Sequence, residues 1–359
     1  MMRFTIHALF GALLALLAVE ALLRFLPVST STKTGYYIHP LILTYPPYQE
    51  FVVSTGWNLR NAQYHRANNY GFLTKRDFVP DSQAIALIGD SFVEANMLVE
   101  PDRLGGQLES LLTPQPVFVL GAPGTSLLDY AERARFARER FDVRNFIFLI
   151  ERGDVRQTLC GSGNIHGPCL DPKTLEPRTE TQPSAGLGKR VLRESALAQY
   201  LFSQLKIDLA ALLKQWQPTA SLPTSGPRQP GGPEDVPLEK VDRIVEAFFA
   251  RLPHGSGERW LLVFDSDRDH LLEMPIPDAP VRNRFIQLAR QAGAEVVDTA
   301  PIFRDYLRAT GLSLHVAPFD KHWNREANRL VAEAIASKFS AAQHAFGVMN
   351  RAAARPAPR

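Results

Sequence analysis

The sequence has few cysteines, little net charge and none of the common nucleotide-binding glycine motifs. Its 359 residues include 2 cysteines and carry a formal net charge of +3. No basic stripe interleaved with aromatic residues occurs, which argues against nucleic acid as a partner. Neither a Walker loop nor a Gly-x-Gly-x-x-Gly motif is present, so we expect neither a nucleotide cofactor nor a metal. With 45% apolar and 21% charged residues, the chain can form one large core with additional segments.

A long apolar run covers residues 4–23. Its length is about that needed to span a bilayer, and Glu20 and Arg24 are spaced for an i, i+4 ion pair at its end. A cleavable signal peptide is the alternative, although no clear Ala-x-Ala site precedes the polar stretch 29–34. We therefore expect residues 1–26 to be a retained membrane anchor or an uncleaved signal.

The two cysteines, Cys160 and Cys169, enclose a short loop that contains glycine, asparagine and proline. A disulfide between them would indicate an oxidising compartment, whereas two unpaired cysteines in a cytosolic loop are the alternative. Zinc is not favoured, because no further cysteine or ordered histidine spacing accompanies the pair. We expect the body of the chain to lie in the periplasm or elsewhere outside the cytoplasm.

Short apolar segments alternate with helical patterns through most of the chain. Five such strands separated by helices predict a three-layer α/β/α sandwich with a five-stranded parallel sheet. The expected strands are 85–88, 117–120, 145–150, 260–264 and 295–297. The expected helices are 96–112, 127–141, 237–252, 278–292 and 325–345, the last of them capped by Asn324. This domain would cover 81–345, after an extracytoplasmic lead-in segment at 27–80 and before a disordered tail at 346–359.

Residues 158–236 interrupt this alternation and form a predicted insertion. It contains the cysteine loop, a helix at 187–216 and a linker at 217–236 that is dense in Pro, Gly and Ser. The helix could be a lid over the site. Apolar residues at helical spacing, such as Leu197, Leu201 and Leu205, favour a helix packed on the sheet instead.

Serine, histidine and aspartate residues occur in a pattern typical of acyl transfer. Gly89-Asp90-Ser91 follows the first predicted strand, which places Ser91 at the carboxyl end of a strand, where open α/β sheets bind ligands. A serine nucleophile needs an imidazole base and a carboxylate that orients it, and His322 and Asp320 can supply both. In an extended segment these two side chains share a face, so we expect them on a loop or turn. Asp90 is expected to cap the helix behind Ser91.

These motifs resemble those of the SGNH, or GDSL-like, hydrolase superfamily, over residues 68–345. The resemblance implies that Ser91 is the nucleophile and that the backbone N–H groups of Ser91 and Gly124 bind the oxyanion. It also implies a flavodoxin-like sheet. The Asp-x-His-Trp block, which ends in Trp323, is similar to that of membrane-anchored polysaccharide O-acetyltransferases and related esterases, and Trp323 and Asp90 are expected to support the site.

The third block of the family departs from its pattern, because Gly-x-Asn-Asp is replaced by Glu151-Arg152-Gly153-Asp154. In the family the asparagine donates a hydrogen bond to the oxyanion, and losing one such donor costs about 3 kcal/mol of transition-state stabilisation. Either Arg152 or another donor substitutes for it, or the enzyme is weak.

The resemblance predicts an extracytoplasmic ester hydrolase or O-acyltransferase that acts on an envelope or secreted polysaccharide, commonly with an acetyl group. A membrane acyl-donor protein is a candidate partner. The alternative is a catalytically weak glycan-binding or assembly component, for which exposed aromatics such as Trp57, Tyr64 and Trp323 would be expected. The other histidines singled out, His166, His270 and His315, are expected to be structural or on the surface.

Residues 68–72 form an Asn-x-x-Gly-Phe stretch just before the first predicted strand. In membrane-anchored relatives such a stretch often leads into that strand. The alternative is a turn that Tyr70 and Phe72 pack on the edge of the sheet.

Overall fold

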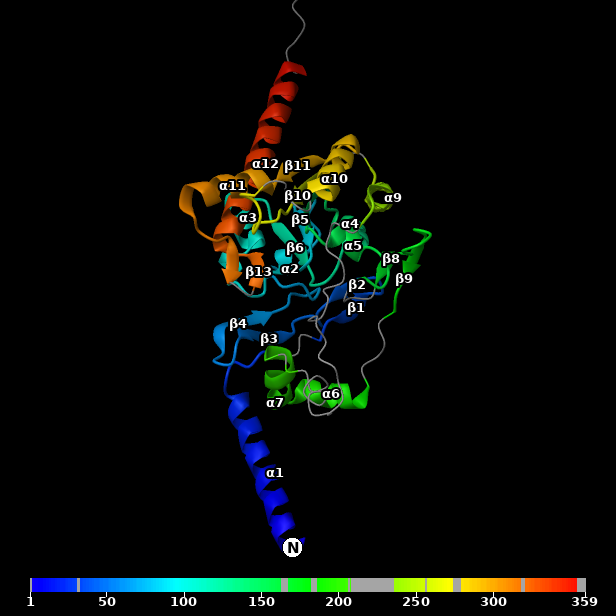
Figure 1. Ribbon diagram of the computed structural model, residues 1–359. Helices are drawn as coiled ribbons and strands as arrows, with labels where there is room; N and C mark the ends of the chain where they lie inside the picture. Colours follow the sequence, from blue (N-terminus) through cyan, green and yellow to red (C-terminus); the bar gives the residue numbers. More distant parts are fainter. Residues whose placement is uncertain are drawn as a thin grey trace, which may run out of the picture.

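Five parallel strands form the central sheet, in the spatial order β11-β10-β7-β5-β6 (Figure 1). The computed structural model describes residues 2–30, 33–162, 167–181, 186–205, 207, 236–255, 257–273, 279–317 and 320–353. The strands are β5 (Ile85–Gly89), β6 (Val117–Gly121), β7 (Asn145–Ile150), β10 (Arg259–Phe264) and β11 (Glu295–Asp298). Taken in chain order, this is the 2-1-3-4-5 arrangement of a flavodoxin-like sheet. The predicted fold class and all five strands are confirmed.

Side chains of the strands alternate between two buried clusters, one on each face of the sheet. Ala86 and Ile88 of β5 belong to the first cluster, while Ile85 and Leu87 belong to the second. This period of two, with both faces buried, is why β5 and β6 are continuously apolar. The first face packs against α4 (Leu127–Phe141), α9 (Leu238–Phe249) and α10 (Ala279–Gln291). The second packs against α3 (Leu104–Leu111), α11 (Thr299–Thr310) and α12 (Arg325–Ala353).

Most predicted helices are confirmed, but a continuous helix over 96–112 is wrong. The chain instead forms α2 (Ser91–Glu94), the 3₁₀ turn η1 (Glu100–Asp102) and then α3. Ala95 ends α2 in the left-handed conformation with φ of 43°. Within the predicted range, Arg103 separates η1 from α3 in an extended conformation with ψ of 157°. A residue with an extended backbone cannot continue a helix.

The helices near the carboxyl end also differ from expectation. α11, which the sequence reasoning missed, begins after Asp298, whose side chain accepts the Ala300 N–H. α12 continues to Ala353, so residues 346–353 have a helical backbone where a disordered tail is predicted. Asn324 accepts the Ala327 N–H at 3.0 Å, as a cap of α12 should.

The lead-in segment forms two antiparallel hairpins ahead of the sheet. They consist of β1 (Gly35–His39) with β2 (Ile42–Thr44), and β3 (Glu50–Thr55) with β4 (Arg60–Arg66). After β4, the Asn68 side-chain oxygen accepts the N–H groups of Tyr70 and Phe72 at 3.0 and 2.9 Å. Tyr70 and Phe72 pack with Phe78 against the first core cluster, as the turn interpretation expects.

The helical elements described in the insertion pack against the N-terminal helix rather than on the sheet. It contains α6 (Leu187–Glu194), α7 (Ala196–Ala198) and the π-helix η2 (Gln199–Gln204). These elements lie between α1 (Met2–Arg24) and the β3–β4 hairpin (Figure 1). Tyr200 Oη donates to the Trp57 carbonyl at 2.7 Å, and Gln204 Nε2 donates to the Gly56 carbonyl at 2.6 Å. The expectation of a helix packed on the sheet is therefore wrong, and most of the predicted 217–236 linker lies outside the described residues.

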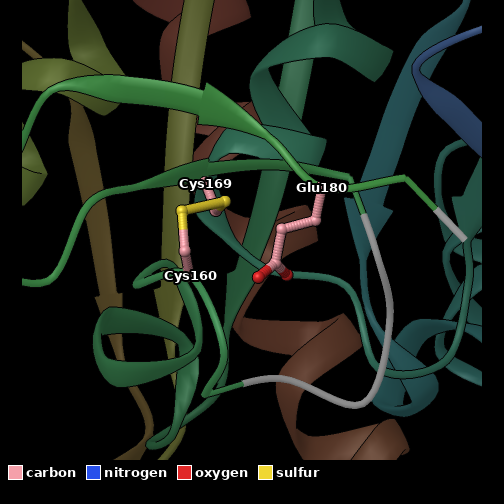
Figure 2. Close-up of side chains that lie close together, drawn as sticks. All are labelled: Cys160, Cys169 and Glu180. Carbon is pink, nitrogen blue, oxygen red and sulfur yellow. A yellow bond between two sulfur atoms is a disulfide. The ribbon is translucent and has the colours of Figure 1, made fainter.

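Cys160 and Cys169 form a disulfide with a Cα–Cα distance of 5.1 Å (Figure 2). Cys169 lies on β8 (Pro168–Leu170), which pairs with β9 (Pro177–Thr179), and Glu180 lies beside the bond. A disulfide sulfur is not a thiolate, so this group offers no cysteine ligand to a metal. Residues 163–166 of the enclosed loop, His166 among them, lie outside the described residues.

Candidate active site

Ser91, His322 and Asp320 form a continuous hydrogen-bonded chain. His322 Nε2 lies 2.8 Å from Ser91 Oγ, and His322 Nδ1 lies 2.6 Å from Asp320 Oδ1. The carboxylate can only accept, so Nδ1 carries the proton and Nε2 is left to accept from the serine hydroxyl. This is the tautomer in which an imidazole can remove the proton of a serine.

Ser91 is held at the carboxyl end of β5 by a sharp strand-to-helix turn. β5 lies beside both β6 and β7, at the point where the strand order reverses and doubly wound sheets bind ligands. Asp90 caps α2, accepting the Phe92 N–H at 2.9 Å, as predicted from the sequence. A Cβ on Gly89 would lie 2.5 Å from a methyl group of Val93, so the close packing of strand and helix requires glycine there.

Asp320 and His322 lie on a short strand, β13 (Asp320–Trp323), and not on the expected loop or turn. β13 pairs with β12 (His315–Ala317) in an antiparallel hairpin. Because alternate residues of a strand share a face, the two side chains still point the same way. Asp320 Oδ1 also accepts the backbone N–H of His322 at 3.1 Å, which fixes the carboxylate against the ring.

Trp323 is a buried support of this strand and not the exposed aromatic that a glycan surface would need. Its side chain is 1% exposed, and Nε1 donates to Asp265 Oδ1 at 2.9 Å. By contrast, Trp57 and Tyr64 are 76% and 73% exposed on or beside the β3–β4 hairpin.

Arg268 joins β13 to the nucleophile turn, a role that the sequence reasoning missed. Its guanidinium pairs with Asp265 and donates to the Lys321 carbonyl at 2.6 Å. It also lies 5.5 Å from the ring centroid of Phe92, which in turn packs 4.8 Å from the His322 ring. The available signal was the charged run 265–269 directly after β10, at the same edge of the sheet as Ser91.

Two opposing effects set the pKa of His322. Burial lowers the pKa, but the hydrogen bond and charge of Asp320, helped by Asp90 and Glu94, outweigh it and raise the pKa above its usual value. A raised pKa makes the imidazole a stronger base. Burial raises the pKa of Asp90 to about 6, so its carboxylate is largely ionised at neutral pH and favours an imidazolium.

Gly124 follows β6, which lies beside β5. Gly121, the last residue of β6, is in register with Gly89, the last residue of β5. The carboxyl ends of both strands are therefore level, which brings the Ser91 and Gly124 turns to the same edge. Gly124 has φ of +72°, a conformation that favours glycine.

The position of the missing asparagine is closely packed. Gly153 is buried, and its N–H donates to Glu151 Oε2 at 2.5 Å. A Cβ there would lie 2.7 Å from Gln157 Nε2, so a larger side chain would displace its neighbours. Arg152, the suggested substitute donor, binds Asp267 with 2.8 Å between Nη2 and Oδ2.

Three carboxyl groups beneath the site, Asp90, Glu151 and Asp154, have oxygens within 4.8 Å of one another. Among the described residues, this cluster of carboxyl groups is a candidate for a metal site. Tyr130 Oη and the Glu151 N–H donate to Asp154 at 2.9 and 2.7 Å, so protein donors already occupy these oxygens. Desolvation raises the pKa of Glu151 to about 7 and also raises that of Asp154, which favours their protonated forms.

The lead-in segment docks directly behind the nucleophile. Tyr45 donates to the buried carboxyl of Glu94 on α2. His65 Nδ1 lies 3.0 Å from Arg103 Nη2, so this nitrogen accepts and Nε2 donates to the Asn96 carbonyl at 2.6 Å. Burial lowers the pKa of His65 to about 4, which keeps it neutral in this role.

Two of the histidines singled out in the sequence, His270 and His315, lie outside the hydrogen-bonded chain that includes Ser91. His270 Nδ1 contacts Asp267 at 2.9 Å, and His315 Nδ1 lies 3.7 Å from Asp269. Both therefore pair with acids of the 265–269 segment.

Comparison with known proteins gives matches among solved structures only: no family model matches the chain, and neither does any curated protein sequence. A member of the lipolytic G-D-S-L family from Veillonella parvula is 11% identical over 70% of this chain and 94% of its own, with a TM-score of 0.35. An acetylxylan esterase from Geobacillus stearothermophilus is 12% identical over 72% and 94%, with a TM-score of 0.37. LAE5, an α/β hydrolase from the metagenome of Lake Arreo, is 14% identical over 72% and 95%, with a TM-score of 0.38.

The first of these structures is described as a member of the lipolytic G-D-S-L family, the class that the sequence motifs resemble. The fold assignment for this chain rests on its own strand order and on the placement of Ser91 at the switch point of the sheet.

Proposed function

We propose that this protein is a serine-dependent O-acyl ester hydrolase or O-acyltransferase. The single observation that carries the proposal is the hydrogen-bonded chain Ser91–His322–Asp320, with 2.8 and 2.6 Å between its members. A serine with this support can attack an ester carbonyl at neutral pH.

In the proposed mechanism, His322 Nε2 removes the Ser91 proton as Oγ bonds to the ester carbonyl carbon. The carbonyl electrons move to oxygen, and the backbone N–H groups of Ser91 and Gly124 stabilise the oxyanion. Collapse of the tetrahedral intermediate breaks the ester bond, and His322 gives its proton to the departing alcohol. Asp320 stabilises the transient imidazolium. An acyl-Ser91 remains.

The second half of the reaction separates hydrolysis from transfer. Water attacking acyl-Ser91 releases the acid, whereas a sugar hydroxyl regenerates an ester on an acceptor. His322 takes the proton of either attacking group. Transfer requires that the site exclude water, because water otherwise competes as the acceptor.

We propose an acetyl group as the acyl group and an envelope or secreted polysaccharide as the substrate, outside the cytoplasm. Support comes from the Asp-x-His-Trp block, from the disulfide Cys160–Cys169 and from α1. Among the described helices, α1 is long and apolar enough over Phe4–Arg24 to cross a membrane. A membrane protein that delivers the acyl group is part of the same proposal.

A catalytically weak glycan-binding role is the second candidate. The replacement of the oxyanion asparagine by Gly153 favours it, as do the exposed rings of Trp57 and Tyr64. The hydrogen bonds that join Ser91, His322 and Asp320 favour the enzyme, because binding alone gives no chemical reason for that geometry.

Turnover of a small acetyl ester by the full chain in detergent tests the proposal, with intact-mass detection of an acetyl adduct. Ser91→Ala should lower turnover by about 10⁴-fold or more and abolish the adduct, since the nucleophile is gone. Ser110→Ala is the matched control, because Ser110 is an exposed serine on α3 whose hydroxyl donates to the Gly106 carbonyl. Equal turnover and adduct in Ser91→Ala and the unaltered chain would overturn the serine mechanism.

A further inference from the structure

α6 separates apolar and basic side chains around its axis. At about 100° per residue, Leu187, Val191 and Leu192 fall within an arc of roughly 140°, and Arg190 and Arg193 fall outside it. Such a separation normally places the apolar face against a protein core.

Among the residues that the structure describes, none forms such a core against the apolar face of α6. Leu187, Val191 and Leu192 are 72%, 62% and 50% exposed, and none of the three belongs to a core cluster of the described residues. Three large apolar side chains on one exposed face indicate an interaction surface.

The carboxyl end of α6 is fixed to the last turn of α1. The Glu20 carboxylate on α1 accepts the N–H groups of Ala196 and Leu197 at 3.0 and 2.9 Å, which caps α7 immediately after α6. Arg24 Nη2 donates to the Glu194 carbonyl at 3.2 Å. The charged pair that interrupts the apolar run of α1 therefore holds α6 in place.

This attachment sets the depth of α6 relative to a bilayer. The part of α1 before Glu20, residues 4–19, is mostly apolar and about 24 Å long, which covers most of a hydrocarbon core of about 30 Å. Glu20 and Arg24 would then lie at headgroup level, together with the α6–α7 junction. Figure 1 shows α1 projecting away from the body and α6 running crosswise to it at that end.

We propose that α6 lies in the membrane–water interface, with its apolar face toward the acyl chains and Arg190 and Arg193 toward anionic phospholipid headgroups. Basic residues beside an exposed apolar face at this depth are the features of an interfacial helix. The proposal rests on α1 being a membrane anchor. With α1 and α6 both held, the body keeps one orientation above the bilayer.

Site-specific fluorescence of the full chain in vesicles tests this. Both native cysteines are in the disulfide, so Val191→Cys adds the only free thiol for a bimane probe. Leu312→Cys, 60% exposed on the segment after α11, is the matched control. The vesicles are phosphatidylcholine with and without phosphatidylglycerol, each carrying a doxyl-labelled lipid quencher.

The probe at residue 191 should be quenched several-fold more than the probe at 312, and more strongly with phosphatidylglycerol. Arg190→Glu together with Arg193→Glu should remove the extra quenching that the anionic lipid gives. If the protein floats with the vesicles but the probes at 191 and 312 are quenched equally, the α6 proposal is overturned and the α1 anchor is not. Chain that fails to float overturns the α1 anchor as well. If the probe at residue 191 is protected from solvent in proportion to protein concentration and not to lipid, a second copy of the protein covers the apolar face of α6. That result also overturns the proposal.

Discussion

At the residue scale, burial and the neighbouring carboxylates have opposite effects on the pKa of His322. Burial alone would weaken the base, since it disfavours the charged imidazolium. Asp320, 2.6 Å from Nδ1, reverses this and leaves the pKa raised. The same carboxylate thus orients the ring and sets its basicity.

The raised pKa predicts the acidic side of the pH–rate profile. Only neutral His322 can accept the Ser91 proton, so kcat/KM should fall as the pH drops below this pKa. Asp320→Asn removes the raising charge, and we expect the fall to move to lower pH while activity decreases by about 10⁴-fold. The measurement is kcat/KM for an acetyl ester against pH.

Asp269→Asn serves as a control, because that carboxylate pairs with Lys321 and lies outside the chain of Ser91. Its profile should keep the unaltered midpoint. A midpoint that stays in place in Asp320→Asn would contradict the assigned role of Asp320.

At the scale of elements, the turn at residues 68–72 joins the lead-in hairpins to the sheet. Gly71 has φ of +77°, and a Cβ there would lie 2.0 Å from the Tyr45 carbonyl oxygen. Tyr45 in turn binds Glu94 behind the nucleophile. The glycine is therefore required both by conformation and by close approach of backbone.

Gly71→Ala should destabilise the protein more than an alanine at a glycine with positive φ in open space. Gly293 is that control, because it has φ of +84° and nothing within 4 Å of its Cβ position. Both variants carry the left-handed strain, of about 1–2 kcal/mol, and Gly71→Ala adds the steric overlap. Thermal unfolding of the full chain in detergent compares them. Equal midpoints would contradict the close approach at Tyr45.

At the scale of the whole molecule, the parts follow one another away from the proposed membrane. α1 and α6 lie at one end, the two hairpins come next, and the sheet with its helices lies beyond them (Figure 1). The Ser91 turn, α2 and β13 face the hairpins, as the contacts of Tyr45 and His65 require. The candidate site is thus on the side of the body toward α1.

The proposed location predicts the redox state of the cysteines in cells. An oxidising compartment keeps Cys160 and Cys169 bonded, so neither should react with a thiol-alkylating reagent until a reductant is added. Mass spectrometry of chain alkylated at lysis measures this, with the Leu312→Cys variant as a control for a reactive thiol. Alkylation of both native cysteines without reductant would contradict an extracytoplasmic body.

Local sequence patterns were sufficient to predict the elements whose apolar and polar residues follow the burial that the fold gives them. The central strands β5 and β6 are uniformly apolar because both faces of the sheet are covered, and α4 was predicted with both of its bounds. The helix expected at 96–112 failed because Arg103, between η1 and α3, has an extended backbone, a conformation that no side-chain periodicity announces. The insertion was misplaced because an amphipathic pattern shows that a face is apolar but not what covers it.

The sequence by itself determined the five strands, the Gly-Asp-Ser turn and the placement of Asp320 beside His322, because each depends on residues close together in the chain. Tertiary structure decided that His322 contacts Ser91, which lies 231 positions earlier in the sequence. It also decided that the paired Arg268 and Asp265 hold strand β13. It also decided that Glu20 caps α7 and so ties the insertion to α1. Such contacts depend on how distant elements pack, which local periodicity does not specify.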